Sequence, residues 1–294
     1  MRSKLNDFID QNKILIEKEM SKHLDNLSIP ERLKKSMTYS IEAGGKRIRP
    51  ILLIASYNAY NKNTQRTLSA AIALEMIHTY SLIHDDLPAM DDDDLRRGKP
   101  TNHIVFDEAT AILAGDALLT YSFELISNDS ALNENEKVKM IQLLAQASGP
   151  KGMVAGQFLD MEAENNEIAI EQLERIHTLK TGELLRFAII GGAYLGGATS
   201  EQQKHLREFA FYLGLIFQVQ DDILDVMGDP ELIGKPTGSD EGNMKSTYPK
   251  LLGTKGAIDK KDEYVTKAKE ALILANANES YLMELTDYFS QRDH

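Results

Sequence analysis

Apolar residues recur at helical spacing along almost the whole chain. In one segment Leu68, Ile72 and Met76 follow one another at intervals of four residues, which places them on one face of a helix. No run of alternating apolar and polar residues bounded by hairpin turns interrupts this pattern. The sequence therefore predicts an all-α protein without a sheet.

Glycine and proline residues punctuate the helical pattern and set its boundaries. The predicted helices span residues 3–24, 30–43, 50–60, 65–87, 101–126, 134–148, 152–165, 170–195, 201–227, 256–275 and 279–290. No linker or change of composition separates two halves of the chain. We therefore expect a single domain over residues 1–294, built as a bundle of roughly ten or more helices.

Composition and charge narrow the class of protein. The hydrophobic fraction of 42% and the charged fraction of 27% are typical of a soluble globular protein. A net charge of -12 disfavours nucleic acid as a partner. The absence of cysteine excludes disulfides and thiolate chemistry, and it is consistent with a cytoplasmic location.

Neither an export signal nor a transmembrane segment is expected. Charges of both signs interrupt the apolar positions near the N-terminus, whereas a signal peptide needs a continuous apolar stretch. The longest uncharged apolar segment, Phe187 to Ser200, has 14 residues and four glycines. This is shorter than the roughly 20 apolar residues that span a bilayer.

A first acidic segment follows a strongly apolar predicted helix. Asp85 and Asp86 stand at its C-terminal end, because Pro88 cannot continue the helix. Negative charge is disfavoured at that end of a helix, and Asp91 begins a further run of four acids. Repulsion among so many carboxylates raises their pKa values or requires cations. A bound metal ion would resolve the conflict.

A second acidic segment lies inside a later predicted helix. Asp225 follows Asp221 by four residues and Asp222 by three, so the three carboxylates can face one side of the helix. The residues around them are apolar, which marks a buried helix where unpaired acids are costly. Hard oxygen ligands in the absence of cysteine favour Mg²⁺. We therefore expect a magnesium site here as well.

Each acidic segment taken alone has a plainer explanation. The first could be a solvated acidic loop, and the second could be the polar face of a helix. A calcium loop is disfavoured, because the EF-hand spacing fails at Leu95 when counted from Asp91 and at Arg96 when counted from Asp92.

Two basic segments lie in loops bounded by glycine and proline, at residues 44–50 and 95–100. Guanidinium groups bind phosphate oxygens in bidentate fashion. Mg²⁺ held by one or two carboxylates is usually coordinated by substrate phosphates as well. Acids, metal and arginines together therefore indicate a diphosphate substrate. An ordinary turn with solvated basic side chains remains the plainer alternative for residues 44–50. Neither nucleotide-binding glycine motif is present.

At this point the motifs match a known family. The chain resembles the short-chain trans-isoprenyl diphosphate synthases, and most closely those of the bacterial farnesyl diphosphate synthase type. The matching segments are 44–50, 75–78, 85–101, 115–118, 156–160, 180–184, 217–225, 234–240 and 245–249. The resemblance covers nearly the whole chain. It implies a helical bundle of the isoprenoid synthase type around a central cavity, and a homodimer.

The resemblance also implies a mechanism, in which isopentenyl diphosphate is joined to an allylic diphosphate. Metal ions and basic groups stabilise the departing diphosphate, so that the substrate ionises to an allylic carbocation. Three Mg²⁺ ions are implied with substrate bound. Their implied ligands are Asp85 and Asp91 with support from Asp86, and Asp221, Asp222 and Asp225.

Further residues receive roles by the same resemblance. Arg96 and Lys235, with Lys180 beside them, are implied to bind the allylic diphosphate. The isopentenyl diphosphate would be bound by Lys46, Arg49, His78 and Arg97. Thr181 and Gln218 would stabilise positive charge near the reacting carbon, and the released diphosphate would take the final proton. In isolation, His78 would more often be a satisfied core histidine.

Product length is expected to depend on Tyr80. This residue precedes Asp85 by five positions, about 7.5 Å back along the helix axis, and the resemblance implies that a bulky residue here limits the growing chain. Ser81 beside it is small, so we expect a fifteen-carbon product. The alternatives are a geranylgeranyl or longer-chain synthase, a terpene cyclase, and a non-catalytic helical subunit.

Overall fold

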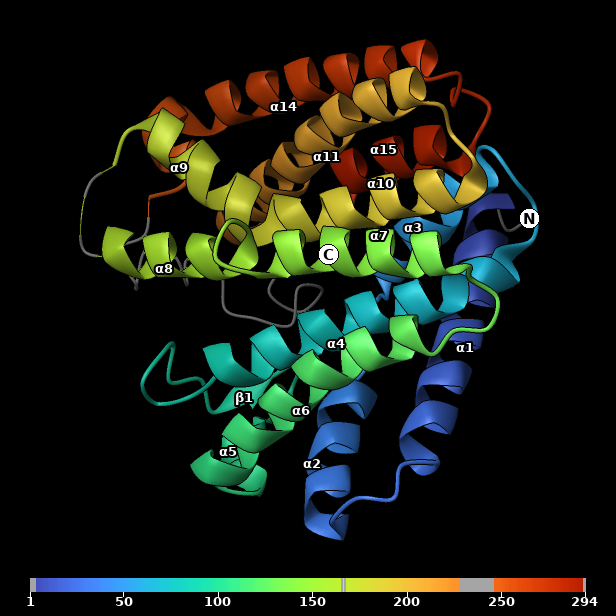
Figure 1. Ribbon diagram of the computed structural model, residues 1–294. Helices are drawn as coiled ribbons and strands as arrows, with labels where there is room; N and C mark the ends of the chain where they lie inside the picture. Colours follow the sequence, from blue (N-terminus) through green and yellow to red (C-terminus); the bar gives the residue numbers. More distant parts are fainter. Residues whose placement is uncertain (1–3, 165, 167, 228–245, 293–294) are drawn as a thin grey trace. The chain divides into compact units, whose positions relative to one another are not determined.

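The computed structural model describes most of the chain, and helices form nearly all of its regular structure (Figure 1). The described residues are 4–164, 166, 168–227 and 246–292. The all-α prediction is confirmed. The chain divides into two compact units, which are described separately. The first comprises residues 1–51 and 64–141, and the second comprises residues 52–63 and 142–294.

The first unit is organised around one apolar helix, α4, which packs against α6, α2 and α1. Its elements are α1 (Lys4–Asp25), α2 (Glu31–Glu42), the start of α3 (Ile48–Asn58), η1 (Thr64–Thr67), α4 (Leu68–Asp85), β1 (Leu95–Arg96), β2 (Lys99–Pro100), α5 (Asn102–Val105), α6 (Glu108–Ser127) and the start of α7 (Glu134–Ser148).

The C-terminal end of α4 lies where the sequence predicts it. Helical residues run to Asp85, and the backbone N–H of Asp86 still donates to the carbonyl of Leu82. Pro88 then prevents a further turn because it has no N–H and clashes with the preceding carbonyls. The first two carboxylates of the acidic segment therefore stand at the negative end of the helix dipole, as expected.

A short hairpin corrects the prediction that the chain contains no strand. Strands β1 and β2 pair antiparallel, with Arg96 opposite Lys99. The two connecting residues, Arg97 and Gly98, both have positive φ, of 53° and 73° respectively. Positive φ at both positions is the signature of a tight primed turn, usually formed by Asn-Gly. The turn was not predicted from the sequence because its first central residue is arginine instead of asparagine.

The predicted helix over residues 101–126 is divided in two by Asp107. This residue has a φ of 136°, and its carboxylate accepts a hydrogen bond of 2.7 Å from the N–H of Thr110. Asp107 therefore caps α6 and cannot continue α5. The predicted boundary missed this break because the apolar pattern runs across it.

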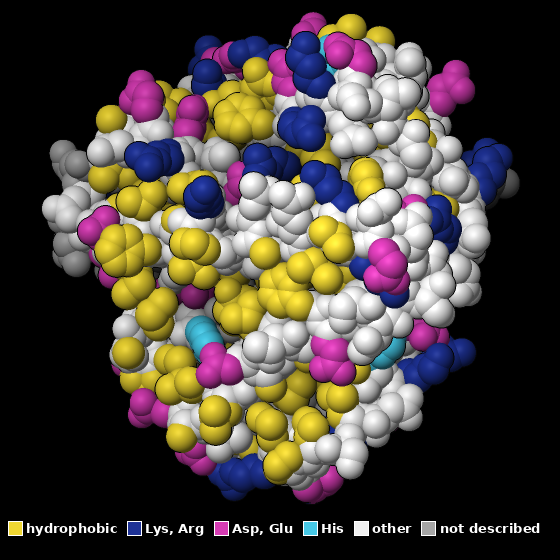
Figure 2. Space-filling model, in the orientation of Figure 1, with side chains coloured by type: hydrophobic (Ala, Val, Ile, Leu, Met, Phe, Trp, Pro, Cys, Tyr) yellow, Lys and Arg dark blue, Asp and Glu magenta, His cyan; other side chains and the backbone are white. Residues whose placement is uncertain are grey.

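Helix α6 is the one described helix that is long and apolar enough to cross a membrane, judged by length and hydropathy alone. Core helices of soluble proteins meet the same criterion. Apolar side chains on α5 and α6 reach the surface, where Figure 2 draws yellow side chains. Ile104 is 52% exposed and Leu113 is 59% exposed. This surface is apolar over several neighbouring turns.

The second unit is organised around the long helix α11, which packs against α14, α10 and α15. Its elements are the rest of α3 and α7, α8 (Met153–Ala163), α9 (Ile170–His177), η2 (Thr178–Gly182), α10 (Glu183–Gly196), α11 (Ser200–Met227), α14 (Tyr248–Leu274) and α15 (Tyr281–Gln291). Helix α14 begins earlier than the predicted residue 256, and Gly253 inside it is non-helical with a φ of 72°.

The predicted helix over residues 170–195 contains a turn of π-helix, η2, which the periodicity did not reveal. Two glycines on neighbouring helices allow close packing against this turn. A Cβ on Gly156 of α8 would lie 2.1 Å from the backbone nitrogen of Lys180, and one on Gly214 of α11 would lie 3.1 Å from Gly182. Turns of this kind recur at functional sites, and this one carries Lys180 and Thr181.

Candidate active site

The first acidic segment folds back on the end of α4. The N–H of Asp91 donates to the carbonyl of Asp85 at 2.9 Å, so the loop returns to the helix end. Asp91 is exposed and Asp85 is half-buried. The two residues predicted to share metal ions are thus joined by a backbone hydrogen bond, at the surface of the unit.

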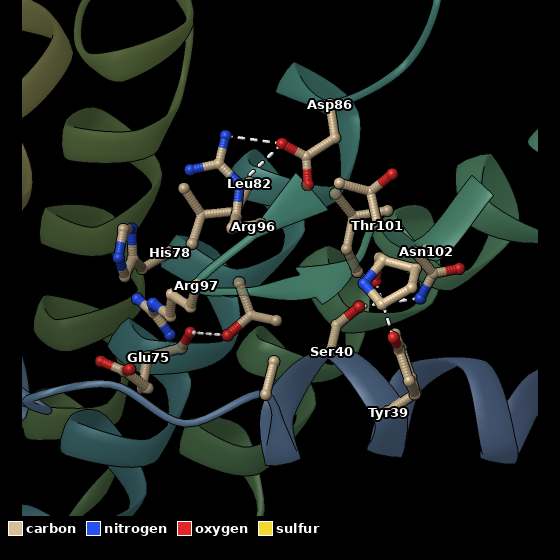
Figure 3. Close-up of a pocket in the computed structure, with 14 residues that line it drawn as sticks. Tyr39, Ser40, Glu75, His78, Leu82, Asp86, Arg96, Arg97, Thr101 and Asn102 are labelled. Carbon is tan, nitrogen blue, oxygen red and sulfur yellow. Dashed lines mark hydrogen bonds and ion pairs between the residues drawn. The ribbon is translucent and has the colours of Figure 1, made fainter. Parts of the chain in front are cut away.

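Asp86 differs from its neighbours, because it is buried and paired. Arg96 of β1 donates from Nε to its carboxylate at 2.6 Å, and a second guanidinium nitrogen lies at 2.5 Å (Figure 3). Burial raises the pKa of the Asp86 carboxyl, although the hydrogen bond from Arg96 opposes the rise. The carboxylate therefore holds Arg96 beside the acidic segment. Asp86, predicted to support the metal ions at Asp85 and Asp91, is thus engaged with Arg96.

Arg97 joins the hairpin to the glycine-rich loop at residues 44–50. Its guanidinium donates to the carbonyl of Gly44, and a Cβ on Gly45 would lie 2.7 Å from the same side chain. Only a glycine at position 45 permits this approach. The two basic segments found in the sequence therefore meet within one unit. Figure 3 draws Arg97 beside His78 and Glu75 of α4.

Arg49 and His78 lie close together, with 3.3 Å between Nη1 of Arg49 and Nε2 of His78. Burial and the positive charges of Arg49 and Arg97 hold the pKa of His78 well below its usual value. The imidazole is therefore neutral at physiological pH. His78 belongs to the basic cluster as a hydrogen-bonding group and contributes no positive charge. Lys46, the remaining residue of this set, is half-buried in the same loop.

Arg47 has a structural role that the sequence did not reveal. Its guanidinium is buried and donates to Glu75 at 2.9 Å, to Glu17 at 3.2 Å and to the carbonyl of Ile41 at 2.5 Å. Removing one partner of a buried ion pair is strongly destabilising. Arg47 thus fixes the glycine-rich loop to α1, α2 and α4. In the sequence Arg47 stands near Lys46 and Arg49, and nothing there indicates these buried contacts.

The pocket behind the first acidic segment is small. It measures about 30 Å³ and is lined by residues of α2, α4 and the hairpin, including His78, Asp86, Arg96 and Arg97 (Figure 3). That volume holds water but not a prenyl diphosphate. His78 and Arg97, predicted to bind isopentenyl diphosphate, line this pocket together with Arg96, predicted to bind the allylic diphosphate.

Tyr80 is buried on α4, one turn before the acidic segment, with 6% of its surface exposed. Its ring contacts the ring of His84 edge to face, with 5.6 Å between the centroids. His84 is in turn held against α6, where Nε2 lies 3.1 Å from the carbonyl of Ile112. A Cβ on Gly115 would lie 2.2 Å from this imidazole. Gly115 therefore makes room for the side chain that supports Tyr80.

Ser81, the small residue beside Tyr80, donates to the carbonyl of His78 at 2.9 Å.

The second unit has a cavity of about 150 Å³ beside the π turn. Its lining includes Asp160, His177, Lys180, Thr181, Gln218 and Asp222. Lys180 donates to Asp160 of α8 at 2.6 Å. Asp160 was not predicted to take part, although it lies inside one of the matched segments, 156–160. It orients the lysine and partly compensates its charge.

A chain of hydrogen bonds leads from the π turn to the second acidic segment. Thr181 donates to Gln218 at 3.4 Å, and Gln218 donates to Asp222 at 3.2 Å. Asp222 is buried and its other oxygen accepts from the N–H of Tyr248 at 3.0 Å. The three residues that the resemblance assigned to the reaction are thus linked to one another. Asp222 also anchors the start of α14.

The other two carboxylates of the second acidic segment are more accessible. Asp221 and Asp225 are both half-buried. Asp221 forms an ion pair with Arg292, a residue after the end of α15 for which no role was predicted. Lys235, predicted to bind the allylic diphosphate, lies outside the described residues.

The carboxylates of the two acidic segments suit metal ions whose remaining coordination positions are filled by a bound substrate. Among the residues that the structure describes, no three His, Asp or Glu side chains converge as a closed metal site. Mg²⁺ characteristically takes one or two carboxylates and fills its remaining positions with water and substrate phosphates. Asp85 and Asp91 on one unit and Asp221 and Asp225 on the other provide accessible oxygen ligands of that kind. The donor sets therefore fit magnesium with a diphosphate.

His177 gives the protein a predictable dependence of stability on pH. It is buried beside Tyr248, with 6.0 Å between nearly parallel rings. Burial lowers the pKa of His177 to about 3, although the negative charge of Asp160 opposes the shift. Below its ordinary pKa of 6.5, the unfolded chain takes up a proton that the folded chain refuses. The free energy of unfolding should therefore fall with decreasing pH. His177 contributes about 1.4 kcal/mol to this fall for each pH unit.

Urea denaturation from about pH 7 to about pH 5 measures this slope. His177→Gln should flatten this slope relative to the unchanged protein. Equal slopes for the unchanged protein and His177→Gln would contradict the assignment.

The sequence matches the polyprenyl synthetase family over residues 30–283. The chain belongs to this family. It is 50% identical over 289 residues to a farnesyl diphosphate synthase from Geobacillus stearothermophilus, covering 98% of this chain and 97% of that one. It is 44% identical over 281 residues to a chloroplastic geranylgeranyl pyrophosphate synthase from Capsicum annuum, covering 94% of this chain and 76% of that one.

A solved structure shares the fold. The geranylgeranyl pyrophosphate synthetase from Pyrococcus horikoshii matches with a TM-score of 0.88 and 27% identity, covering 98% of each chain. Family membership confirms the resemblance inferred from the motifs, the isoprenyl synthase fold and the prediction of a trans-prenyltransferase.

Proposed function

We propose that this trans-prenyltransferase makes farnesyl diphosphate, by adding isopentenyl diphosphate to dimethylallyl diphosphate and then to geranyl diphosphate. The observation that carries the proposal is the position of Tyr80, buried one turn before the metal-binding end of α4. The relative from Geobacillus stearothermophilus, named for the same product, supports it. We also propose that the two units, each of which carries one acidic segment, belong to a single domain.

Magnesium would be held by the accessible carboxylates, two ions at Asp85 and Asp91 and a third at the second acidic segment. When bound, it neutralises the diphosphate and promotes its departure. Arg96 adds positive charge from a fixed position, because the buried Asp86 holds its guanidinium at 2.5–2.6 Å. Lys180 adds charge from the π turn, oriented by Asp160. These residues bind the leaving group before and after the bond breaks.

Thr181 and Gln218 would stabilise the carbocation through their oxygens. The hydroxyl of Thr181 donates to Gln218, which leaves the lone pairs of the hydroxyl oxygen available to positive charge. Gln218 is oriented in turn by its bond to Asp222. No protein base is required, since the released diphosphate can take the proton.

The second diphosphate, that of isopentenyl diphosphate, would be bound by Lys46, Arg49, Arg97 and the neutral His78. Arg97 is positioned by the carbonyl of Gly44, and Arg49 contacts His78. A neutral imidazole donates one hydrogen bond to a phosphate oxygen without adding to the repulsion between the neighbouring guanidinium groups. This makes His78 a suitable member of a crowded basic cluster.

Replacing Tyr80 tests the proposed product length. Tyr80→Ala removes the ring, so we expect the main product to lengthen from fifteen to twenty carbons or more. Tyr121→Ala on α6 is a matched control and should still give fifteen carbons. Chromatography of the dephosphorylated products measures the outcome. A fifteen-carbon main product from Tyr80→Ala would show that the ring does not limit the chain. A twenty-carbon main product from the unchanged protein would favour a geranylgeranyl diphosphate synthase.

We also propose a homodimer in the cytoplasm, with the apolar surface of α5 and α6 covered by a second copy. Ile112 is 41% exposed and Leu113 is 59% exposed, and burial of such neighbours would stabilise association. Sedimentation should give a dimer, which Leu113→Glu should dissociate. Val138→Glu, at a 67% exposed position on α7, is the control. A monomeric unchanged protein would contradict the proposal.

A further inference from the structure

Arg292 is the charged partner of the second acidic segment. Its guanidinium forms an ion pair with Asp221. The same terminal nitrogen donates to the carbonyl of Phe217 at 3.1 Å, and the guanidinium carbon lies 4.0 Å from the centroid of the Phe217 ring. Only 9% of the Arg292 side chain is exposed. Three contacts on one turn of α11 thus define where the positive charge lies.

The backbone around Arg292 is fixed to the same helix. Gln220 donates to the carbonyl of Arg292 at 2.7 Å. Lys261 of α14 donates to Gln220 at 2.7 Å and to the carbonyl of Ser290 at 2.9 Å. The segment after α15 is therefore held to α11 and α14 by hydrogen bonds that do not involve the guanidinium. The position of the charge is built into the fold of this unit.

Within the described part of the chain, the guanidinium of Arg292 has one nitrogen without a hydrogen bond, besides its contacts with Asp221 and Phe217. Its Nε is buried and has no hydrogen-bond partner among the described residues. Among the described residues, Asp221 is the carboxylate with which this guanidinium pairs. Any other cation that binds Asp221 must therefore share the carboxylate with Arg292 or displace it. The ion pair and a metal ion compete for one group.

We propose that Arg292 is a counter-cation that keeps the second acidic segment from binding a divalent cation until a diphosphate is present. This inference rests on the proposed function, in which Asp221 is a magnesium ligand. A dication beside Arg292 meets repulsion from the guanidinium. A diphosphate brings several negative charges, which compensate the dication and Arg292 together. The third ion would then enter with the substrate instead of before it.

Titration with Mn²⁺, followed by the paramagnetic resonance signal of the free ion, tests this inference. The full chain carries Asp85→Asn and Asp91→Asn throughout, so that binding reports the second acidic segment. Without diphosphate, Arg292→Gln should bind Mn²⁺ about threefold or more tightly than the chain with Arg292. With inorganic diphosphate, that difference should shrink. Arg292→Lys, which keeps the charge, should resemble the chain with Arg292.

Two further variants separate the possible failures. Arg186→Gln removes a guanidinium paired with Glu183 elsewhere in the same unit, and it should leave Mn²⁺ binding unchanged. Asp221→Asn should weaken Mn²⁺ binding in the presence of diphosphate. If it does not, Asp221 is no ligand and the proposed metal site is wrong. If Asp221→Asn weakens binding but Arg292→Gln binds no more tightly than the chain with Arg292, only the role of Arg292 is overturned.

Discussion

Chelation of divalent cations should abolish prenyl transfer while leaving the helical structure of this protein nearly unchanged. The accessible carboxylates need ions only when a diphosphate is bound. The buried carboxylate Asp86 already has Arg96 as its partner, and Asp221 has Arg292. Removing the metal therefore leaves no unpaired buried charge at these two residues. We expect turnover to fall by about 10³-fold or more.

Turnover of isopentenyl diphosphate with geranyl diphosphate is measured before EDTA, after EDTA and after excess Mg²⁺. Far-ultraviolet circular dichroism and thermal unfolding are recorded in the same samples. Activity that survives chelation would contradict the proposed mechanism. Loss of helical signal on chelation would show instead that the ions hold the fold.

Substitutions of two neighbouring residues in the second acidic segment should affect different properties. Asp221→Asn should lower activity, and Asp222→Asn should lower stability. Asp221→Asn changes a half-buried carboxylate that the mechanism assigns to magnesium. We expect turnover to fall by about 10²- to 10³-fold, with little change in the free energy of unfolding. An asparagine oxygen can still accept a hydrogen bond from Arg292.

Asp222→Asn should instead reduce stability. The two oxygens of Asp222 accept from Gln218 and from the N–H of Tyr248. Asparagine has one acceptor oxygen, so one buried donor loses its partner, which costs about 1–3 kcal/mol. Urea denaturation and turnover of both variants measure the contrast. Equal loss of stability in the two variants would contradict the separate roles inferred for these neighbours.

Much of the fold could be predicted because local signals agree with it. The end of α4 follows from Pro88, and the helical class follows from apolar residues at intervals of three and four. The hairpin at Arg97-Gly98 was missed, because its turn uses an arginine at a position of positive φ. The π turn was missed because α9 and α10 adjoin it directly on either side, so the whole segment resembles one continuous helix.

The candidate site divides in the same way. Motif matches identified Lys180 and Gln218, and the structure brings each into contact with a further acid, Asp160 or Asp222. Pairs between residues far apart in sequence, such as Asp221 with Arg292, carry no local signal. Arg47 belongs to the basic segment at residues 44–50, but it is buried in an ion pair with Glu75. Only tertiary contacts distinguish a binding arginine from a structural one.

The tight turn of the hairpin has a practical consequence for experiments on substrate binding. Arg97 occupies the first central position of the turn with a φ of 53°, where asparagine is the favoured residue. Arg97→Asn would therefore remove the guanidinium while preserving the backbone geometry, a separation that alanine does not offer. In this hairpin the effect of the Arg97 charge can therefore be measured without changing the backbone conformation of the turn.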